Sequence, residues 1–134
     1  MIANNFSSYI RPAAVAGMFY PGHEKELRNA VQNYLQIAGE AESELKIDLS
    51  EITTIRMLIV PHAGYIYSGK TAAFAYQYLN QLKNKIRRVI LFGPAHRFRL
   101  TGAALPGVDS FRTPLGMITL DSELMEKILN EYSW

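Results

Sequence analysis

The 134-residue sequence contains no cysteine, so its own residues can form neither a disulfide nor a thiolate metal site. It has no apolar run near the ~20 residues that a membrane-spanning helix needs, and its first ten residues do not resemble a signal peptide. The formal net charge of +2 is too small to indicate a nucleic-acid partner. These absences favour a cytoplasmic protein with neither a membrane nor a nucleic acid as its partner.

Apolar residues make up 49% of the chain and charged residues 19%, which is ordinary for one globular domain with a buried core. Two short apolar runs, "IRMLIVP" at 55–61 and "RRVILFGP" at 87–94, are typical of strands buried on both faces. Between them, apolar residues at helical spacing predict a helix from Gly69 to Lys83. Strand, helix and strand in this order form a βαβ unit, which implies parallel strands.

Further elements are predicted on both sides of this unit. A helix should begin at His23 or Glu24, because one apolar face recurs through Leu27, Ala30, Val31, Tyr34 and Leu35. The acidic stretch 39–51 is predicted to be a surface connection, and residues 102–105 and 116–120 are predicted to be short strands. Asp121 should cap a last helix over 122–134. The predicted fold is α/β, with a mainly parallel sheet and helices on both faces.

A histidine follows each of the two predicted buried strands. His62 comes after Pro61, and His96 ends the sequence Gly-Pro-Ala-His. In open α/β sheets, sites lie beyond the carboxyl ends of the strands, and neighbouring strands are ~4.8 Å apart. If the two strands are neighbours, both imidazoles can reach one ion. The alternative is that each histidine has only a structural role. Imidazole binds iron, copper and zinc alike, so the residue type does not identify the metal.

Residues Gly64 to Thr71 also match the phosphate-loop pattern G-x-x-x-x-G-K-[ST]. A phosphate cradle favours small residues, whereas Tyr65, Ile66 and Tyr67 are bulky, and no aspartate ends the next predicted strand to hold Mg²⁺. Nucleotide binding is therefore the less favoured alternative. In the preferred interpretation, Gly64 allows a sharp turn beside His62. The hydroxyls of Ser68 and Thr71 then accept hydrogen bonds from free N–H groups at the helix start.

Four motifs occur in one order along the chain: "RPAAVAGMFYPG", "VPHAGYIYSG", "LFGPAH" and "FRTPLG". Together they closely resemble the Memo family, also called AmmeMemoRadiSam system protein B. This family is similar to the class III extradiol dioxygenases, non-haem iron enzymes that open catechol rings. The resemblance implies a three-layer α/β/α fold and a metal-binding cleft, with a redox or dioxygenase role. His62 and His96 match the cleft histidines that ligate iron or copper in the family, and zinc remains open.

The same motifs suggest residues around the metal. Gly64, Tyr65, Thr113 and Pro114 are predicted to line the cleft, although packing is an equal alternative for Tyr65. Asp109 lies close to the fourth motif and is predicted either to hydrogen-bond a histidine N–H beside the metal or to make a turn.

The sequence also departs from the family pattern. Family members are considerably longer, and their remaining ligands, a His and a Cys, lie in a second half that is absent here; Val15 stands where some members carry a His. We therefore expect residues 1–134 to be the N-terminal portion of a single Memo-like domain. Alone, this portion should bind metal weakly, lack ring-opening activity and self-associate.

The resemblance also bears on partners and on a rival function. It implies a radical-SAM protein and an AMMECR-type domain as partners, besides the second half, and a small molecule or a peptide as ligand. The alternative function is a protein- or peptide-interaction module without catalysis.

Overall fold

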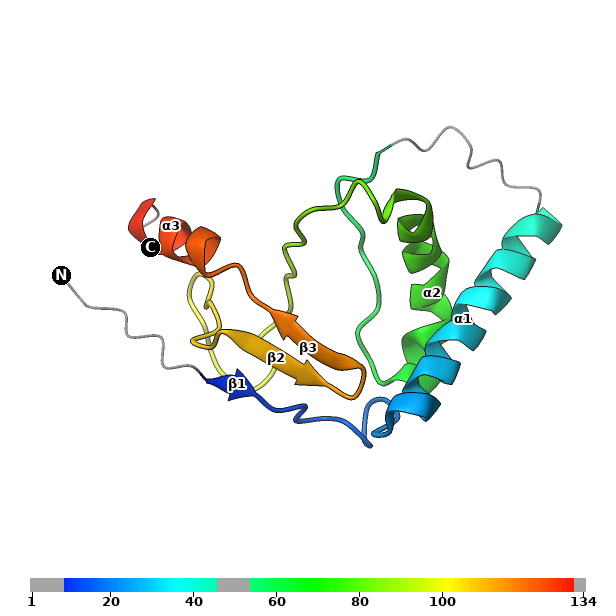
Figure 1. The fold of residues 1–134 in the computed structure, drawn as a ribbon, viewed down its shortest axis with the longest axis horizontal. Helices are drawn as coiled ribbons and strands as arrows, with labels where there is room; N and C mark the ends of the chain where they lie inside the picture. Colours follow the sequence, from blue (N-terminus) through cyan, green and yellow to red (C-terminus); the bar gives the residue numbers. More distant parts are fainter. Residues whose placement is uncertain (1–8, 46–53, 132–134) are drawn as a thin grey trace. The chain divides into compact units, whose positions relative to one another are not determined.

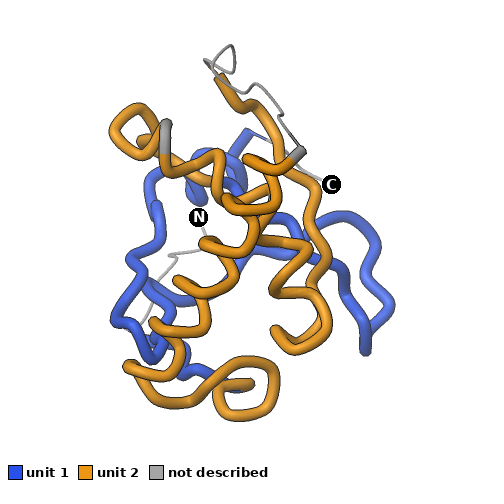
Figure 2. Tube along the Cα trace, turned by 90° about the vertical axis from the view of Figure 1, so that its right-hand side faces the viewer, with its two compact units in different colours: residues 1–14, 90–134 blue, residues 15–89 orange. Residues whose placement is uncertain are grey.

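The computed structural model describes residues 9–45 and 54–131. In chain order, its elements are β1 (Ile10–Arg11), α1 (Glu24–Leu45), α2 (Tyr65–Leu82), β2 (Ser110–Thr113), β3 (Gly116–Thr119) and α3 (Ser122–Glu131) (Figure 1). The predicted α/β class is confirmed. The chain divides into two compact units, one of residues 15–89 and one of residues 1–14 with 90–134 (Figure 2).

In the unit of residues 15–89, helices α1 and α2 pack side by side (Figure 1). Tyr34 of α1 lies against Gly69 of α2, and Gly39 lies against Gln77, so the two helices run in the same direction. The buried apolar residues of this unit are Leu27, Ala38, Ala72, Ala73 and Leu82.

The two helices differ from the predictions at their ends. Helix α1 begins as predicted but continues to Leu45, through part of the stretch 39–51 that was predicted to be a connection. Glutamate, alanine and leucine in this stretch are good helix formers, and Gly39 faces α2. Residues 46–51 of that prediction lie outside the described part. Helix α2 begins at Tyr65 and not at Gly69, because Gly64 already serves as the N-cap residue.

The other unit holds a three-stranded sheet in the order β1-β2-β3. Strands β1 and β2 are parallel, with Ile10 opposite Ser110, whereas β2 and β3 form an antiparallel hairpin. The predicted strand at 116–120 is thus confirmed, but the sheet among the described residues is not mainly parallel. The hairpin was missed because "TPLG" was interpreted as a family motif and not as a turn between two strands.

Three predicted strands are absent from the described residues. Residues 55–61 and 87–94 have irregular backbone, and most of their side chains are exposed. An apolar run becomes a buried strand only where neighbouring strands pair with its N–H and C=O groups, and no ladder includes either segment in the described part of the chain. Residues 102–105 also form no strand; the left-handed backbone of Gly102, with φ of 86°, is incompatible with an extended strand.

Helix α3 begins as predicted. The Leu124 N–H donates a hydrogen bond of 3.0 Å to the Asp121 side-chain oxygen, which confirms the N-cap. The helix ends at Glu131, and residues 132–134 of the prediction lie outside the described part. None of the helices within residues 9–45 and 54–131 has the length and apolar character needed to cross a membrane.

The contact between α1 and α2 predicts opposite effects for two Gly-to-Ala substitutions. A Cβ on Gly69 would lie 2.8 Å from Cε2 of Tyr34, so Gly69→Ala forces the packed ring to move. We expect it to destabilise the chain by about 1–3 kcal/mol. Gly39→Ala is the control. The new Cβ would lie 3.7 Å from Oε1 of Gln77, an ordinary contact. This substitution should therefore stabilise the helix by about 0.5–1 kcal/mol. Urea unfolding followed by circular dichroism measures the free energy of unfolding of both variants. A more stable Gly69→Ala variant would contradict the packing of Tyr34 against Gly69.

Candidate functional site

His62 lies in irregular backbone just before α2, and its side chain is exposed. The residues that follow it are held from two sides. The Ser68 hydroxyl donates a 2.8 Å hydrogen bond to the carbonyl of Ala63, and the Tyr65 N–H donates a 2.7 Å hydrogen bond to the carbonyl of Phe19. The chain on the carboxyl side of His62 is therefore fixed to the start of α2.

Phe19 belongs to a tight loop in the first motif. The Gly17 N–H donates to the Tyr20 carbonyl at 2.8 Å, and the Phe19 N–H donates to the Val15 carbonyl at 2.9 Å. Gly17 has a φ of 80°, a left-handed conformation that favours glycine. The structure thus brings the first and second motifs together, and sequence reasoning did not find this contact. The only signal for it was that both motifs are rich in glycine and aromatic residues.

Gly64 and Ser68 act differently from their predicted roles. Gly64 has φ of −56° and ψ of 150°, which any residue adopts, so the predicted glycine-dependent sharp turn is wrong. Its carbonyl instead accepts the N–H groups of Tyr67 and Ser68 as the first acceptor of the helix. Ser68 is only 6% exposed, and its hydroxyl donates to a carbonyl rather than accepting an N–H. Thr71 lies within the helix and not at its start.

Tyr65 takes part in a cluster of tyrosine rings. Its centroid is 5.8 Å from that of Tyr20 and 6.3 Å from that of Tyr34, the second pair being edge-to-face. Burial raises the pKa of the Tyr65 hydroxyl above its ordinary value of 10.0, and nearby tyrosine hydroxyls, that of Tyr76 first, add to the rise. Tyr65 therefore has a packing role between α1, α2 and the loop of the first motif. Its lining of a cleft stays a prediction.

The phosphate-loop match does not form a cradle. Helix α2 starts at Tyr65, so nearly all of the matched residues are helical. The N–H groups of Tyr65, Tyr67 and Ser68 already donate to the carbonyls of Phe19 and Gly64. A phosphate cradle needs consecutive N–H groups turned toward the anion. The local geometry therefore disfavours nucleotide binding here.

Thr113 and Pro114 lie at the turn of the β2–β3 hairpin. The Thr113 hydroxyl donates to the Gly116 carbonyl at 3.0 Å and accepts the Leu115 N–H at 3.1 Å. Gly116 has a φ of 126°, which favours glycine at this position. These contacts give the motif a structural role as a turn, whereas its predicted position in a cleft wall remains a prediction.

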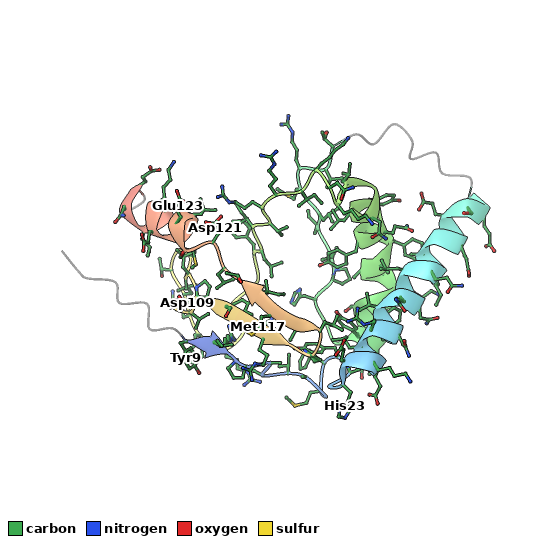
Figure 3. All side chains as sticks on the ribbon, in the orientation of Figure 1. Tyr9, His23, Asp109, Met117, Asp121 and Glu123 are labelled. Atoms are coloured by element: carbon green, nitrogen blue, oxygen red, sulfur yellow. The ribbon has the colours of Figure 1, made fainter. Side chains whose placement is uncertain are left out.

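Asp109 precedes β2 (Figure 3) and continues the sheet pairing through its backbone. Its N–H donates to the Tyr9 carbonyl at 3.1 Å, and its carbonyl accepts the Leu120 N–H at 2.8 Å. The backbone of Asp109 thus links the segments next to all three strands. The predicted hydrogen bond between its side chain and a metal-bound histidine is not tested.

His96 lies in a bend of irregular backbone, and its side chain is exposed. It belongs to the unit that contains the sheet, whereas His62 belongs to the unit of the two helices. No group of three or more His, Cys, Asp or Glu side chains that could hold a metal occurs within residues 9–45 and 54–131. That the two histidines share one ion stays a prediction.

Comparison with known proteins gives one consistent family. The model of the family described as Memo-like protein matches residues 11–133. A Caenorhabditis elegans protein named "Protein memo-1 homolog" is 34% identical over 128 residues, covering 96% of this chain and 33% of the relative. A "MEMO1 family protein" of Aquifex aeolicus is 38% identical over 124 residues, covering 90% of this chain and 40% of the relative.

The yeast protein "MEMO1 family protein MHO1" is 33% identical over 123 residues, covering 91% of this chain and 34% of the relative. The chain thus spans well under half the length of these curated relatives. No solved structure matches it.

The buried hydroxyl of Ser68 predicts a loss of stability on its removal. Ser68→Ala deletes the hydrogen bond to the Ala63 carbonyl, and we expect a loss of about 0.5–1.5 kcal/mol in the free energy of unfolding. Ser43→Ala is the matched control, because its hydroxyl also donates to a helix carbonyl, that of Gly39, but is exposed. In urea unfolding, the control should have almost the same free energy of unfolding as the wild type. Equal losses in both variants would argue against the special role of Ser68.

The raised pKa of Tyr65 predicts a pH-dependent loss of stability. Below pH 10, Tyr65 is protonated in the folded and the unfolded chain alike. Above the unfolded pKa of about 10, the unfolded chain releases the proton first, so stability falls until pH passes the higher folded pKa. Unfolding of wild type and Tyr65→Phe, measured from pH about 9 to about 11, should show a shallower decline for the variant. Parallel declines would contradict this burial of the hydroxyl.

Proposed function

Because the chain belongs to the Memo-like protein family, we propose that His62 and His96 are ligands which it contributes to a metal-binding cleft. The cleft resembles that of the non-haem iron extradiol dioxygenases, in a three-layer α/β/α fold, with iron or copper as the metal and zinc as a third choice. One observation supports this most. The exposed imidazole of His62 precedes a backbone segment that two hydrogen bonds fix to the start of α2.

The donor set limits what the described residues can do alone. Structural and catalytic metal sites usually use three or four protein ligands, whereas no group of three such side chains occurs among residues 9–45 and 54–131. Two imidazoles do not fit a complete resident metal site. We therefore place the remaining ligands on polypeptide outside the described residues, and any redox or dioxygenase chemistry belongs to the completed cleft. The chain alone should have no ring-opening activity.

A second candidate function is a peptide- or protein-interaction module. Met18 of the first-motif loop is exposed, and so are Ile66 and Tyr67 in the first turn of α2. The Tyr65-to-Phe19 hydrogen bond links these two segments. Such exposed apolar side chains suit a docking surface. Oxygen uptake on addition of a catechol to the metal-loaded protein separates a dioxygenase from such a module. The radical-SAM and AMMECR-type partners remain predictions from the same family resemblance.

Metal titration tests the ligand assignment. We expect the 134-residue chain to bind Zn²⁺ weakly in calorimetry and to lose it on dialysis, because most of the coordination sphere stays water. His62→Ala and His96→Ala should each weaken binding further, and the double variant should lose less binding free energy than the sum of the two single losses if both imidazoles share an ion.

His23→Ala is the control for this titration, since His23 is also exposed but lies just before α1, outside the cleft motifs. It should bind Zn²⁺ like the wild type. If His23→Ala weakened binding as much as the other two variants, the assignment of His62 and His96 would be wrong. Stoichiometric metal retained after dialysis would show instead that the chain holds a complete site.

A further inference from the structure

The backbone on both sides of His62 is restrained, although this residue belongs to none of the helices and strands of the described residues. Pro61 precedes it, and the ring of a proline fixes its own φ at about −65°. Ala63 follows it, and the Ala63 carbonyl accepts the 2.8 Å hydrogen bond of the Ser68 hydroxyl. His62 therefore lies between a rigid ring and a peptide group that a side chain holds.

The hydrogen bond of Ser68 differs from that of an ordinary helical serine. A serine inside a helix commonly donates to the carbonyl four residues before it. Here that carbonyl belongs to Gly64 and lies 3.4 Å from the Ser68 hydroxyl oxygen, whereas the shorter contact of 2.8 Å reaches Ala63, one residue further back. Ala63 lies outside α2, which begins at Tyr65. The hydroxyl therefore restrains the segment next to His62 and not only the helix.

Burial and two further contacts strengthen this restraint. Ser68 is only 6% exposed, and a hydrogen bond shielded from water is electrostatically stronger than an exposed one. The Tyr65 N–H donates to the Phe19 carbonyl at 2.7 Å. Gly64 lies so close to the same residue that an added Cβ would be 3.4 Å from the Phe19 carbonyl oxygen. Residues 63–65 are thus held by α2 and by the loop of the first motif.

We propose that Ser68 is a positioning residue for His62, because its hydroxyl holds the Ala63 carbonyl and so orients the backbone that carries the imidazole. This inference rests on the proposed function of His62 as a metal ligand. Ordering a backbone segment costs conformational entropy, and a site whose binding geometry is only partly populated has a correspondingly lower affinity. Ser68 reduces this cost by fixing the neighbouring peptide group in advance. It acts through Ala63 and is not itself a ligand.

Zn²⁺ titration of the 134-residue chain in calorimetry tests the proposal with two matched pairs. Ser68→Ala is compared with the wild type, and Ser68→Val with Ser68→Thr, which has the same shape but keeps a hydroxyl. In each pair, we expect the chain without the hydroxyl to bind Zn²⁺ about threefold to tenfold more weakly. The second pair gives the same comparison if Ser68→Ala does not fold. Ser43→Ala removes an exposed hydroxyl within α1 and should leave the affinity unchanged.

The His62→Ala background separates positioning from a general loss of stability. Circular dichroism first verifies that the helices of each variant are formed under the conditions of the titration. In this background, Ser68→Ala should weaken Zn²⁺ binding no further, because the residue that Ser68 positions is gone. A purely structural role would lower the free energy of unfolding in both backgrounds without this coupling in affinity.

A second measurement needs no metal. In nuclear magnetic resonance relaxation, the order parameters of the Ala63 and Gly64 amides should fall in Ser68→Ala and stay as in the wild type in Ser68→Thr. The amides of α3 should not change in either variant. Equal order parameters for Ala63 and Gly64 in all three chains would overturn the proposal.

Three results of the titration would also overturn it. In the first, loss of the Ser68 hydroxyl leaves the affinity unchanged although His62→Ala weakens it, which refutes the positioning role and keeps His62 as a ligand. In the second, Ser68→Ala weakens binding equally with and without His62, so that Ser68 acts elsewhere. In the third, His62→Ala leaves the affinity unchanged, which refutes the ligand assignment and the positioning role together.

Discussion

The hydrogen bond from the Tyr65 N–H to the Phe19 carbonyl organises the helical unit. The first N–H groups of a helix have no partner within the helix, and here the carbonyl of Phe19 satisfies one of them at 2.7 Å. The bond joins residues of two different motifs, and these two residues are more than forty positions apart in the sequence. It also sets Tyr65 against Tyr20 and Tyr34, so that loop, α1 and α2 meet in one place. The position of the chain after His62 follows from this arrangement.

Local patterns of the sequence predicted what depends on local contacts. The apolar face of α1, the start of α3 and its Asp121 cap all rest on residues within one or two turns of one another. Strand β3 was also predicted from its own residues. Gly39 and Gly64 show where this approach failed. Gly39 was taken to begin a connection but packs inside a helix, and Gly64 was taken to need glycine but has an ordinary backbone conformation.

Contacts between distant residues set the remainder of the fold, and the sequence patterns do not contain them. The apolar run at 87–94 has the composition of a buried strand, but composition does not provide the neighbour with which a strand must pair. The same holds for the site. The motifs predict His62 and His96 as site residues, and this stays a prediction. They did not indicate that Phe19 holds the chain after His62 or that Ser68 donates to Ala63. These contacts have no signature in residue spacing.

The backbone before each histidine bears on the metal affinity proposed for this chain. His62 directly follows residues 55–61, and His96 follows residues 87–94. Neither stretch belongs to a helix or to a strand ladder within the described residues. Ordering such a stretch around a bound metal costs conformational entropy. The weak metal affinity expected of the chain alone would then reflect this cost as well as the small number of its ligands.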